Sequence, residues 1–365
     1  PMTDVVALQP ELTEIADGLA FPEGPIAMPD GSVILVEMFG PRLTRVAPDG
    51  SKETIAEISG GPNGAAIGPD DAVYLCNNGG CFTASEAMGL TLPGPFDPSR
   101  YIGGRIQRVD LHTGEVTDLY TECDGRPLRA PNDLIMDGHG GFWFTDHGLR
   151  DHGARTSDLT GIYWARSDGS EIREVVFPTE GPNGIGLSPD LDTLYWAETF
   201  SGRVFRRQIA DAGVLGDSAG PGLDPDLVLH GAPGLQFFDS LAVDGDGYVC
   251  VATILNGGIT AISPDGSKVE HWATDDTITT NICFGGEDLR TAYVTLSSTG
   301  RLVSVPWPRE GLRPCHCCDA HRLRSTSART PERSWYANGG VGRRLRLGRG
   351  AAVLSRDARL PEERR

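Results

Sequence analysis

The chain repeats one sequence pattern six times, and this repeat constrains its fold more than any other feature. Each copy begins with a polar and a small residue, continues through an apolar stretch to an Asp/Gly turn, and ends in a β-rich run. Two short apolar runs around such a turn are typical of a β-hairpin. The copies occupy residues 22–37, 62–77, 131–146, 182–198, 238–253 and, in a weaker form, 280–296.

Two further strand-like segments accompany each hairpin. The first follows a glycine and alternates apolar and polar residues with the period of two expected of a strand; its copies are 40–50, 103–114, 160–169, 201–210, 257–266 and 299–307. The second follows in five copies, at 52–58, 115–121, 171–177, 226–231 and 268–274. Its sixth equivalent, 11–19, lies before the first hairpin.

This arrangement predicts an all-β fold, a six-bladed β-propeller over residues 1–311. Each blade would hold four antiparallel strands, and the N-terminal strand would complete the last blade. Closing the ring removes the exposed sheet edges that invite aggregation. The 48 glycines and 26 prolines suit a protein of many turns and are too many for a helix bundle. The alternative, an open β-sandwich or two barrels, is disfavoured by six-fold recurrence in a fixed order.

The first position of the hairpins is always polar, and we call this set the polar ring. In a propeller the innermost strands line a central channel, so equivalent positions converge at one height. Six oxygen-bearing side chains, two of them carboxylates, favour a hard cation, above all Ca²⁺, with Zn²⁺, Mn²⁺ or Mg²⁺ as alternatives. For any single Asn, turn formation is the competing interpretation. The members are Glu23, Asn63, Asn132, Asn183, Asp239 and Asn281.

The charge is divided unevenly along the chain. The net charge is -18, from 32 basic and 50 acidic residues. Residues 312–365 contain 13 Arg and 5 acids, a net of +8, so the remaining residues carry -26. An acidic body argues against nucleic acid as a partner. No apolar run approaches the roughly 18 residues of a membrane span, and we expect neither membrane insertion nor a signal peptide, but a cytoplasmic protein with reduced cysteines.

Residues 312–365 show no sustained period after the last strand pattern. Three interpretations stay open: a Cys/His metal knuckle around CHCCDAH at 315–321, a basic interaction arm, and out-of-frame translation. We favour the third, because Arg is abundant and Lys absent, and predict an irregular, poorly ordered tail that the fold does not need. A separate segment, 79–103, is a long Gly- and Pro-containing connection of the kind that is usually functional.

Five stretches resemble the gluconolactonase, senescence marker protein and luciferin-regenerating enzyme family: FPEGP at 21–25, APNDLIMD at 130–137, FWFTD at 142–146, GPNGIGLSPD at 181–190 and FFDSLAVD at 237–244. The resemblance spans residues 11–308. It implies a six-bladed propeller with one catalytic divalent ion, often Ca²⁺, in the channel, and a metal-dependent lactonase activity. It also implies that the metal ligands are Glu23, Asn132, Asn183 and Asp239.

The sugar-lactone members of that family carry an Arg two residues before the Asn that matches Asn132. Here that position is Ala130, with Arg129 one step earlier, which argues against a sugar-acid lactone. We expect a small-molecule lactone of lower polarity. Its binding residues are predicted to be Asn63, Arg129, Asp146, His147 and Asn281.

The predicted chemistry is opening of the lactone by water. Asp239 is the first candidate for the general base and Asp133 the second. Asp133, Asp146 and His147 each have a competing interpretation as satisfied turn or core groups. Two other functions stay open: a phosphotriester or fluorophosphate hydrolase that uses the same ion, and a non-catalytic propeller that binds a partner with structural calcium.

Overall fold

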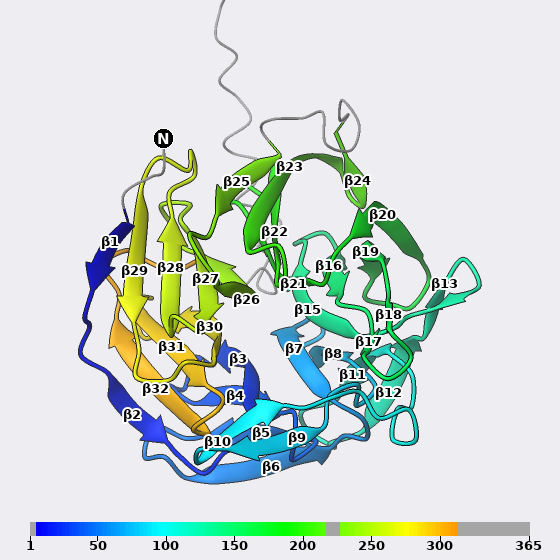
Figure 1. Cartoon of the computed structure of the whole chain (residues 1–365), viewed down its shortest axis with the longest axis horizontal. Helices are drawn as coiled ribbons and strands as arrows, with labels where there is room; N and C mark the ends of the chain where they lie inside the picture. Colours follow the sequence, from blue (N-terminus) through cyan, green and yellow to red (C-terminus); the bar gives the residue numbers. More distant parts are fainter. Residues whose placement is uncertain (1–4, 217–226, 313–365) are drawn as a thin grey trace, which may run out of the picture. The chain divides into compact units, whose positions relative to one another are not determined.

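The computed structural model describes residues 5–216 and 227–312. These residues form strands and turns without an α-helix, and six sheets stand around a central axis (Figure 1). Within the described ranges no helix is long and apolar enough to cross a membrane. Each innermost strand packs against the innermost strand of the next sheet, and the sixth returns to the first. The predicted all-β, six-bladed propeller is therefore confirmed.

Each blade is one sheet whose strands run in chain order from the channel outward. Blade I contains β3 (Pro22–Ala27), β4 (Val33–Glu37), β5 (Arg42–Val46) and β6 (Lys52–Glu57). Blade II contains β7 (Pro62–Ile67), β8 (Val73–Asn77), β11 (Arg105–Val109) and β12 (Val116–Tyr120). Blade III contains β15 (Pro131–Met136), β16 (Gly141–Asp146), β19 (Thr160–Arg166) and β20 (Ile172–Thr179).

The second half of the ring repeats this order. Blade IV contains β21 (Pro182–Leu187), β22 (Thr193–Glu198), β23 (Arg203–Asp211) and β25 (Val228–Gly231). Blade V contains β26 (Phe237–Val243), β27 (Val249–Ile254), β28 (Gly258–Ile262) and β29 (Val269–Ala273). Blade VI contains β30 (Thr279–Gly285), β31 (Thr291–Leu296) and β32 (Arg301–Pro306).

The N-terminal residues complete the ring. Strand β2 (Thr13–Ala16) pairs antiparallel with β32 and supplies the outer strand of blade VI, as predicted. Two blades exceed the predicted four strands. Strand β1 (Val5–Leu8) adds to blade V in parallel with β29, because its backbone groups find the free outer edge of that strand, and β24 (Val214–Leu215) extends blade IV beside β23.

The hydrophobic core is divided among the six interfaces between neighbouring blades. Strand β4 is buried over its whole length, and its alternate side chains face opposite blades. Ile34 and Val36 pack with residues of blade II, whereas Val33 and Leu35 pack with residues of blade VI. Both faces of each blade are thus buried, which explains the near-continuous apolar runs of the second strands.

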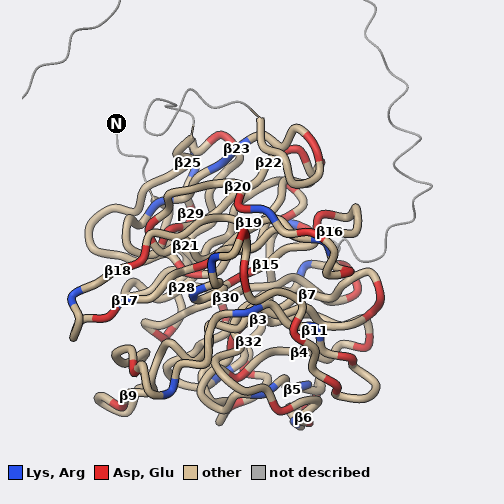
Figure 2. Tube along the Cα trace, turned by 90° about the vertical axis from the view of Figure 1, so that its right-hand side faces the viewer, with Lys and Arg blue, Asp and Glu red and all other residues tan. Residues whose placement is uncertain are grey.

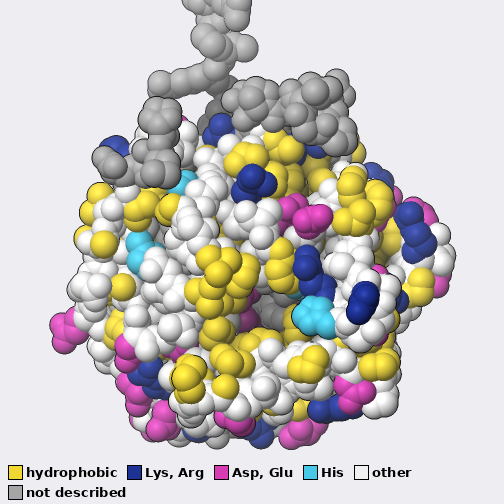
Figure 3. Space-filling model, viewed as in Figure 1, with side chains coloured by type: hydrophobic (Ala, Val, Ile, Leu, Met, Phe, Trp, Pro, Cys, Tyr) yellow, Lys and Arg dark blue, Asp and Glu magenta, His cyan; other side chains and the backbone are white. Residues whose placement is uncertain are grey.

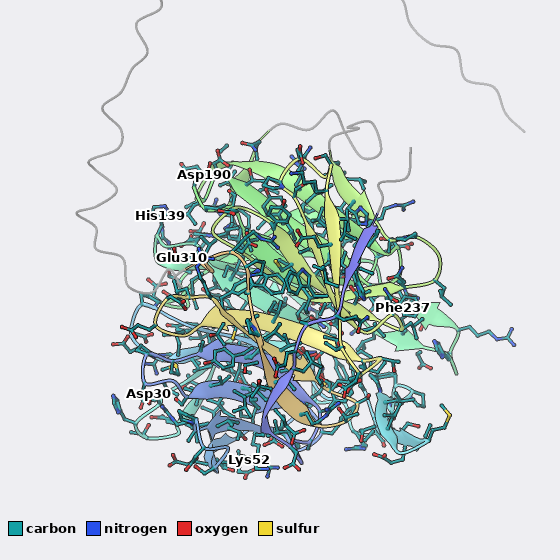
Figure 4. All side chains as sticks on the ribbon, turned by 90° about the vertical axis from the view of Figure 1, so that its left-hand side faces the viewer. Asp30, Lys52, His139, Asp190, Phe237 and Glu310 are labelled. Carbon is teal, nitrogen blue, oxygen red and sulfur yellow. The ribbon has the colours of Figure 1, made fainter. Side chains whose placement is uncertain are left out.

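Three short hairpins extend from the ring: β9 (Ala84–Ala87) with β10 (Leu90–Pro93), β13 (Glu122–Cys123) with β14 (Arg126–Pro127), and β17 (Arg150–Asp151) with β18 (Thr156–Ser157). Strands β9, β17 and β18 project from the same side of the ring (Figure 2). Phe237, which begins an inner strand, lies on that side, and the turns at Asp30, His139 and Asp190 lie on the opposite one (Figure 4). We call the side that carries Phe237 the loop face.

The predicted loop 79–103 contains the β9–β10 hairpin, which reaches from blade II to blade VI. The Thr91 amide donates a hydrogen bond to the Ser298 carbonyl at 3.0 Å. Phe82 and Leu92 from the same segment pack with Phe21 of blade I. The segment therefore covers part of the loop face where blades VI, I and II meet.

The last described residues are held firmly by blades V and VI. Trp307 is buried against Phe284, and Arg309 forms ion pairs with Asp244 and Glu270 at 2.5 and 3.0 Å. The Gly311 amide donates to the Leu289 carbonyl at 2.8 Å. The predicted 312–365 tail lies outside the described residues from 313 onward, so its interpretations stay predictions.

Removal of residues 313–365 is expected to leave the fold and activity unchanged, because every blade is complete before that segment. The midpoint of thermal unfolding of the truncated and full-length chains should agree within about 1 °C, which is less than the shift of roughly 1.5 °C expected for a loss of 1 kcal/mol in a chain of this size. Loss of soluble protein on truncation would show that the tail contributes to folding.

Candidate functional site

The six residues of the polar ring lie near the start of the six inner strands. In every one of these strands the pairing with the second strand shifts register at or beside the polar position. Such β-bulges redirect side chains and are common next to active sites. Apolar side chains of these strands alternate and pack between neighbouring blades. The bulge interrupts this alternation at the polar residue, so its side chain need not point between the blades.

Contacts between blades bring these positions together around the axis. The Asn281 side-chain amide donates to Glu23 Oε2 at 3.2 Å and joins the last blade to the first. The Ser240 hydroxyl donates to Asn183 Oδ1 at 3.4 Å and joins blades V and IV. Blades II and III meet closely, since a Cβ on Gly64 would lie 2.4 Å from Asp133 Oδ1.

Three carboxyl groups are buried at this site. Glu23, Asp133 and Asp239 are 3%, 6% and 8% exposed, respectively. Burial raises the pKa of Glu23 to about 7, and burial together with the negative charge of Glu23 raises the pKa of Asp133 to about 7. Burial, followed by the charge of Glu23, holds the pKa of Asp239 well above its usual range. None of these three carboxylates takes part in an ion pair formed by the described residues.

Two amide oxygens of the polar ring also lack a partner. Asn63 Oδ1 and Asn132 Oδ1 are buried and accept no hydrogen bond from the part of the chain that the structure describes. A buried polar atom without a partner is costly, so such atoms usually serve a ligand, an ion or water. Uncompensated carboxylates beside free amide oxygens make the donor set that a hard divalent cation prefers. The residues present therefore fit the predicted ion.

The donor set is a mixed one. Among the described residues, no group of three or more His, Cys, Asp or Glu side chains is arranged to hold a metal. The candidate site instead combines Glu23 and Asp239 with the amides of Asn132 and Asn183. This composition is typical of calcium sites, where carbonyl oxygens supplement a few carboxylates.

Residues that the sequence did not single out orient these side chains. The Asn183 side-chain Nδ2 donates to Thr199 Oγ1 at 3.1 Å, and its Oδ1 accepts from the Ser240 hydroxyl. The Thr145 hydroxyl donates to the Asn183 carbonyl at 2.6 Å, and the Asp133 amide donates to Thr145 Oγ1 at 3.1 Å. Thr145 could have been found from the sequence, because it is a polar residue inside an otherwise apolar second strand.

Two of the predicted substrate-binding residues are engaged with the chain itself. Asp146 is fully buried, and its carboxylate accepts the backbone N–H groups of Arg129, Ala130 and Gly148 at 2.7, 2.7 and 3.0 Å. The Arg129 guanidinium forms an ion pair with Asp158 at 2.8 Å. Both residues fix the segment that leads into Asn132, and a direct contact with substrate stays a prediction.

His147 lies close to the aromatic side chains of the loop face. Its ring centroid is 6.1 Å from that of Phe82 and 5.3 Å from that of Phe200. Burial, followed by the nearby positive charge of Arg150, lowers the pKa of His147 to about 4, so its imidazole is neutral at pH 7. Its Nδ1 is buried without a hydrogen-bond partner among residues 5–216 and 227–312, so this nitrogen is available to a bound molecule.

Apolar side chains border the polar ring on the loop face. Phe21, Met38 and Ile278 form a buried cluster with Phe39, Phe82, Leu92 and Ile254. Asn63 Nδ2 approaches Met38 Sδ at 3.9 Å, so this cluster meets the ring directly. Figure 3 shows hydrophobic side chains around a central opening, with basic and histidine side chains beside it over β15–β18.

The sequence model of the SMP-30/Gluconolactonase/LRE-like region matches residues 21–298, which include all six positions of the polar ring. The chain belongs to this family. The predicted resemblance is therefore confirmed, and the family match covers all the inner strands described above.

Individual relatives share about a quarter of their residues with this chain. The chain is 27% identical over 264 residues to lactonase drp35 of Staphylococcus haemolyticus, covering 72% of each chain. It is 26% identical over 247 residues to lactonase drp35 of Staphylococcus aureus (strain MRSA252), covering 66% of this chain and 65% of the relative.

Solved structures share the fold. The calcium-binding protein regucalcin from Agrobacterium tumefaciens has a TM-score of 0.67 at 17% identity, over 85% of this chain and 98% of the other. A gluconolactonase from Xanthomonas campestris has a TM-score of 0.64 at 22% identity, over 81% of this chain and 89% of the other.

The raised pKa values predict an unusual dependence of stability on pH in EDTA. Glu23 and Asp133 have ordinary values of 4.5 and 3.8 and folded values of about 7, so the folded chain binds their protons more tightly than the unfolded chain. Their contribution to stability is therefore complete below pH 4 and is lost as pH rises to about 7. Thermal unfolding in EDTA should show the midpoint falling between pH 5 and 7.5, whereas excess CaCl₂ should remove most of that fall.

Proposed function

We propose that this chain is a metal-dependent lactone hydrolase with one divalent cation, Ca²⁺, bound at the polar ring. Membership of the family and two relatives named lactonase support lactone hydrolysis. The observation that supports the metal is a set of buried oxygens: three carboxyl groups that form no ion pair with the described residues, and two amide oxygens that accept no hydrogen bond from them.

Glu23, Asn132, Asn183 and Asp239 would hold the cation. Two carboxylates balance a charge of two, and the amide oxygens complete the site without repulsion. When bound, a divalent cation supplies Lewis acidity that polarises the lactone carbonyl and makes a nearby water more acidic. The Asn183 side chain donates to Thr199 Oγ1 and accepts from the Ser240 hydroxyl, so these two residues fix its orientation.

Proton transfer is assigned to the carboxylates. Water forms a bond to the carbonyl carbon, and the bond from that carbon to the ring oxygen breaks, which gives a hydroxy acid. Asp239, with Asp133 as the second candidate, accepts the proton of the water and returns it to the departing ring oxygen. The Ser240 and Leu134 backbone N–H groups donate to Asp239 Oδ1 at 3.1 Å and Asp133 Oδ1 at 2.9 Å, respectively, and these bonds help to fix the orientation of each carboxylate.

The border of the site supports a substrate of lower polarity. Phe21, Met38 and Ile278 are buried beside the ring, and Phe200 and Phe237 continue an aromatic surface on the loop face. Burial of alkyl groups against such residues contributes roughly 25 cal/mol for each Å² of apolar surface removed from water. We infer that a lactone with an alkyl or aryl substituent binds better than a sugar lactone.

A substrate panel tests this function. The EDTA-treated chain, with and without added CaCl₂, would be given alkyl and aryl lactones, sugar lactones and phosphotriesters at equal concentration. We expect calcium-dependent opening of the alkyl and aryl lactones, with at least a tenfold lower kcat/KM for the sugar lactones. Preferential cleavage of phosphotriesters would assign the site to that chemistry, and calcium binding without any hydrolysis would indicate a binding module.

A further inference from the structure

Arg150 is a cation on the loop face with which no described residue forms an ion pair. It begins strand β17, and its side chain is only partly exposed. Its guanidinium carbon lies 3.3 Å from the centroid of the Phe200 ring. No hydrogen bond or ion pair to this guanidinium is present among residues 5–216 and 227–312, and the carboxylate that acts on it electrostatically is that of the exposed Glu180.

Arg129 differs from Arg150 in that its guanidinium forms an ion pair within the chain. Arg129 is the basic residue that the sequence offered for substrate binding, but Asp158 occupies its guanidinium and also accepts the Leu149 amide at 3.0 Å. Asp158 thereby ties the start of the β17–β18 hairpin to the segment before Asn132. Arg129, through its ion pair with Asp158, therefore holds the hairpin in place. Arg150, which begins the hairpin, is the arginine that remains available to a ligand.

Packing places Arg150 close to the candidate metal site. Phe200 lies against Gly181, where an added Cβ would be 2.7 Å from its ring, and Gly181 is two residues before Asn183. Thr199, the neighbour of Phe200, accepts the hydrogen bond from the Asn183 side chain. The Phe200 ring also lies 6.2 Å from that of Phe237. A single aromatic ring thus separates the guanidinium from the residues that orient a proposed ligand.

The way in which Arg150 is held leaves its donors free. Stacking on Phe200 uses the flat face of the guanidinium, whereas its five N–H groups point outward in the plane and match a carboxylate in geometry. Burial lowers the pKa of Arg150, although the group stays charged at neutral pH. A cation partly removed from water and without a partner gains from an anionic ligand.

We propose that Arg150 is a specificity-determining residue that binds an anionic substituent, such as a carboxylate, on the lactone substrate. The substrate class is then a lactone with an apolar body, which rests on the aromatic surface, and a negative group remote from the ring that opens. This inference rests on the proposed function, since it names the substrate class of the same site.

Matched substrates and variants test the proposal. Arg150→Gln and Arg150→Lys would be compared with the full-length chain in excess CaCl₂, using an alkyl lactone that carries a terminal carboxylate and the same lactone with a primary amide. Arg155→Gln is the control, because Arg155 is exposed on the same hairpin and its substitution removes the same charge. Binding would be measured separately by calorimetry, with an arylalkyl carboxylate and its primary amide as probes.

Loss of a charge-assisted hydrogen bond is expected to lower kcat/KM for the carboxylate substrate by roughly 10- to 100-fold in Arg150→Gln, mainly through KM. The amide substrate and the Arg155→Gln variant should change by less than about twofold, and Arg150→Lys should keep most of the preference. The carboxylate probe should bind the wild-type chain more tightly than the amide probe, and Arg150→Gln should remove that difference.

Equal losses for both substrates, or a lower midpoint of thermal unfolding without a change in selectivity, would give Arg150 a purely structural role and overturn the proposal. Failure of the proposed function looks different, because the wild-type chain would then open no lactone while the two probes would still report on Arg150. Equal binding of both probes to the wild-type chain would refute the anionic preference whatever the activity.

Discussion

Asp239→Asn is expected to reduce lactone hydrolysis by about a thousandfold or more. The substitution removes one of two carboxylates that balance a divalent cation, and it also removes the first candidate for the general base, a role worth about 10²- to 10⁴-fold. The rate should be measured with CaCl₂ in excess of the variant's own dissociation constant, so that loss of the ion and loss of the base can be separated. An unchanged rate with calcium still bound would show that Asp239 has neither role.

Companion variants divide the two roles. Glu23→Gln should weaken calcium binding strongly but retain more of the rate once calcium is saturating, because Glu23 is assigned only as a ligand. Asp133→Asn should retain calcium, and a rate loss as large as that of Asp239→Asn would make Asp133 the base. Asp190→Asn, on the face opposite Phe237 (Figure 4), is the control and should behave as the wild-type chain.

The same substitutions should stabilise the metal-free chain. Buried like charges oppose folding, and the charge of Glu23 is among the causes that raise the pKa of Asp239 and Asp133. In EDTA at pH 7.5, Glu23→Gln and Asp239→Asn should therefore unfold at a higher temperature than the wild-type chain and should lose most of the shift caused by CaCl₂. Functional sites commonly sacrifice stability in this way.

Gly64→Ala is expected to cost about 3 kcal/mol or more of the free energy of unfolding. The added Cβ would lie 2.4 Å from Asp133 Oδ1, 2.5 Å from Asp133 Cα and 2.6 Å from the Asn132 carbonyl oxygen. Two of these atoms belong to the backbone of the next inner strand, so they can yield only if blades II and III move apart. The movement would also displace Asn132, and calcium affinity should fall together with stability.

Denaturant unfolding in EDTA measures the stability effect without the ion. Gly216→Ala is a suitable control, because the atom nearest to its added Cβ is 3.5 Å away, which is an ordinary contact distance. If Gly64→Ala cost less than about 1 kcal/mol, the close approach of the inner strands would not be required by the fold.

Local patterns in the sequence were sufficient to predict the propeller. Hairpin turns and alternating apolar residues repeat in every blade, and the outlying segment that became β2 carried the same pattern as the other outer strands. Strand β1 was missed because four residues that add in parallel to an existing edge carry no turn or repeat of their own. Its partner, β29, lies more than 260 positions away in the chain.

The sequence predicted only those site residues that occupy equivalent positions in the repeat. The polar ring followed from equivalent positions, but the bulges that redirect its side chains leave no mark in a single sequence. Arg129 and Arg150 could not be told apart from sequence, because the difference lies in the tertiary contact of Arg129 with Asp158, 29 residues away. Likewise, the reach of Leu92 across to Phe21 is a consequence of how the 79–103 segment folds over the ring.

The most direct test of the account is a titration of the EDTA-treated chain with CaCl₂, in which the rate of opening of an alkyl lactone is followed as calcium is added. We expect no hydrolysis without the ion, a rise in rate with each addition, and a plateau at one calcium ion per chain. Full hydrolysis in EDTA, or a rate that does not change as calcium binds, would contradict a catalytic cation at the polar ring.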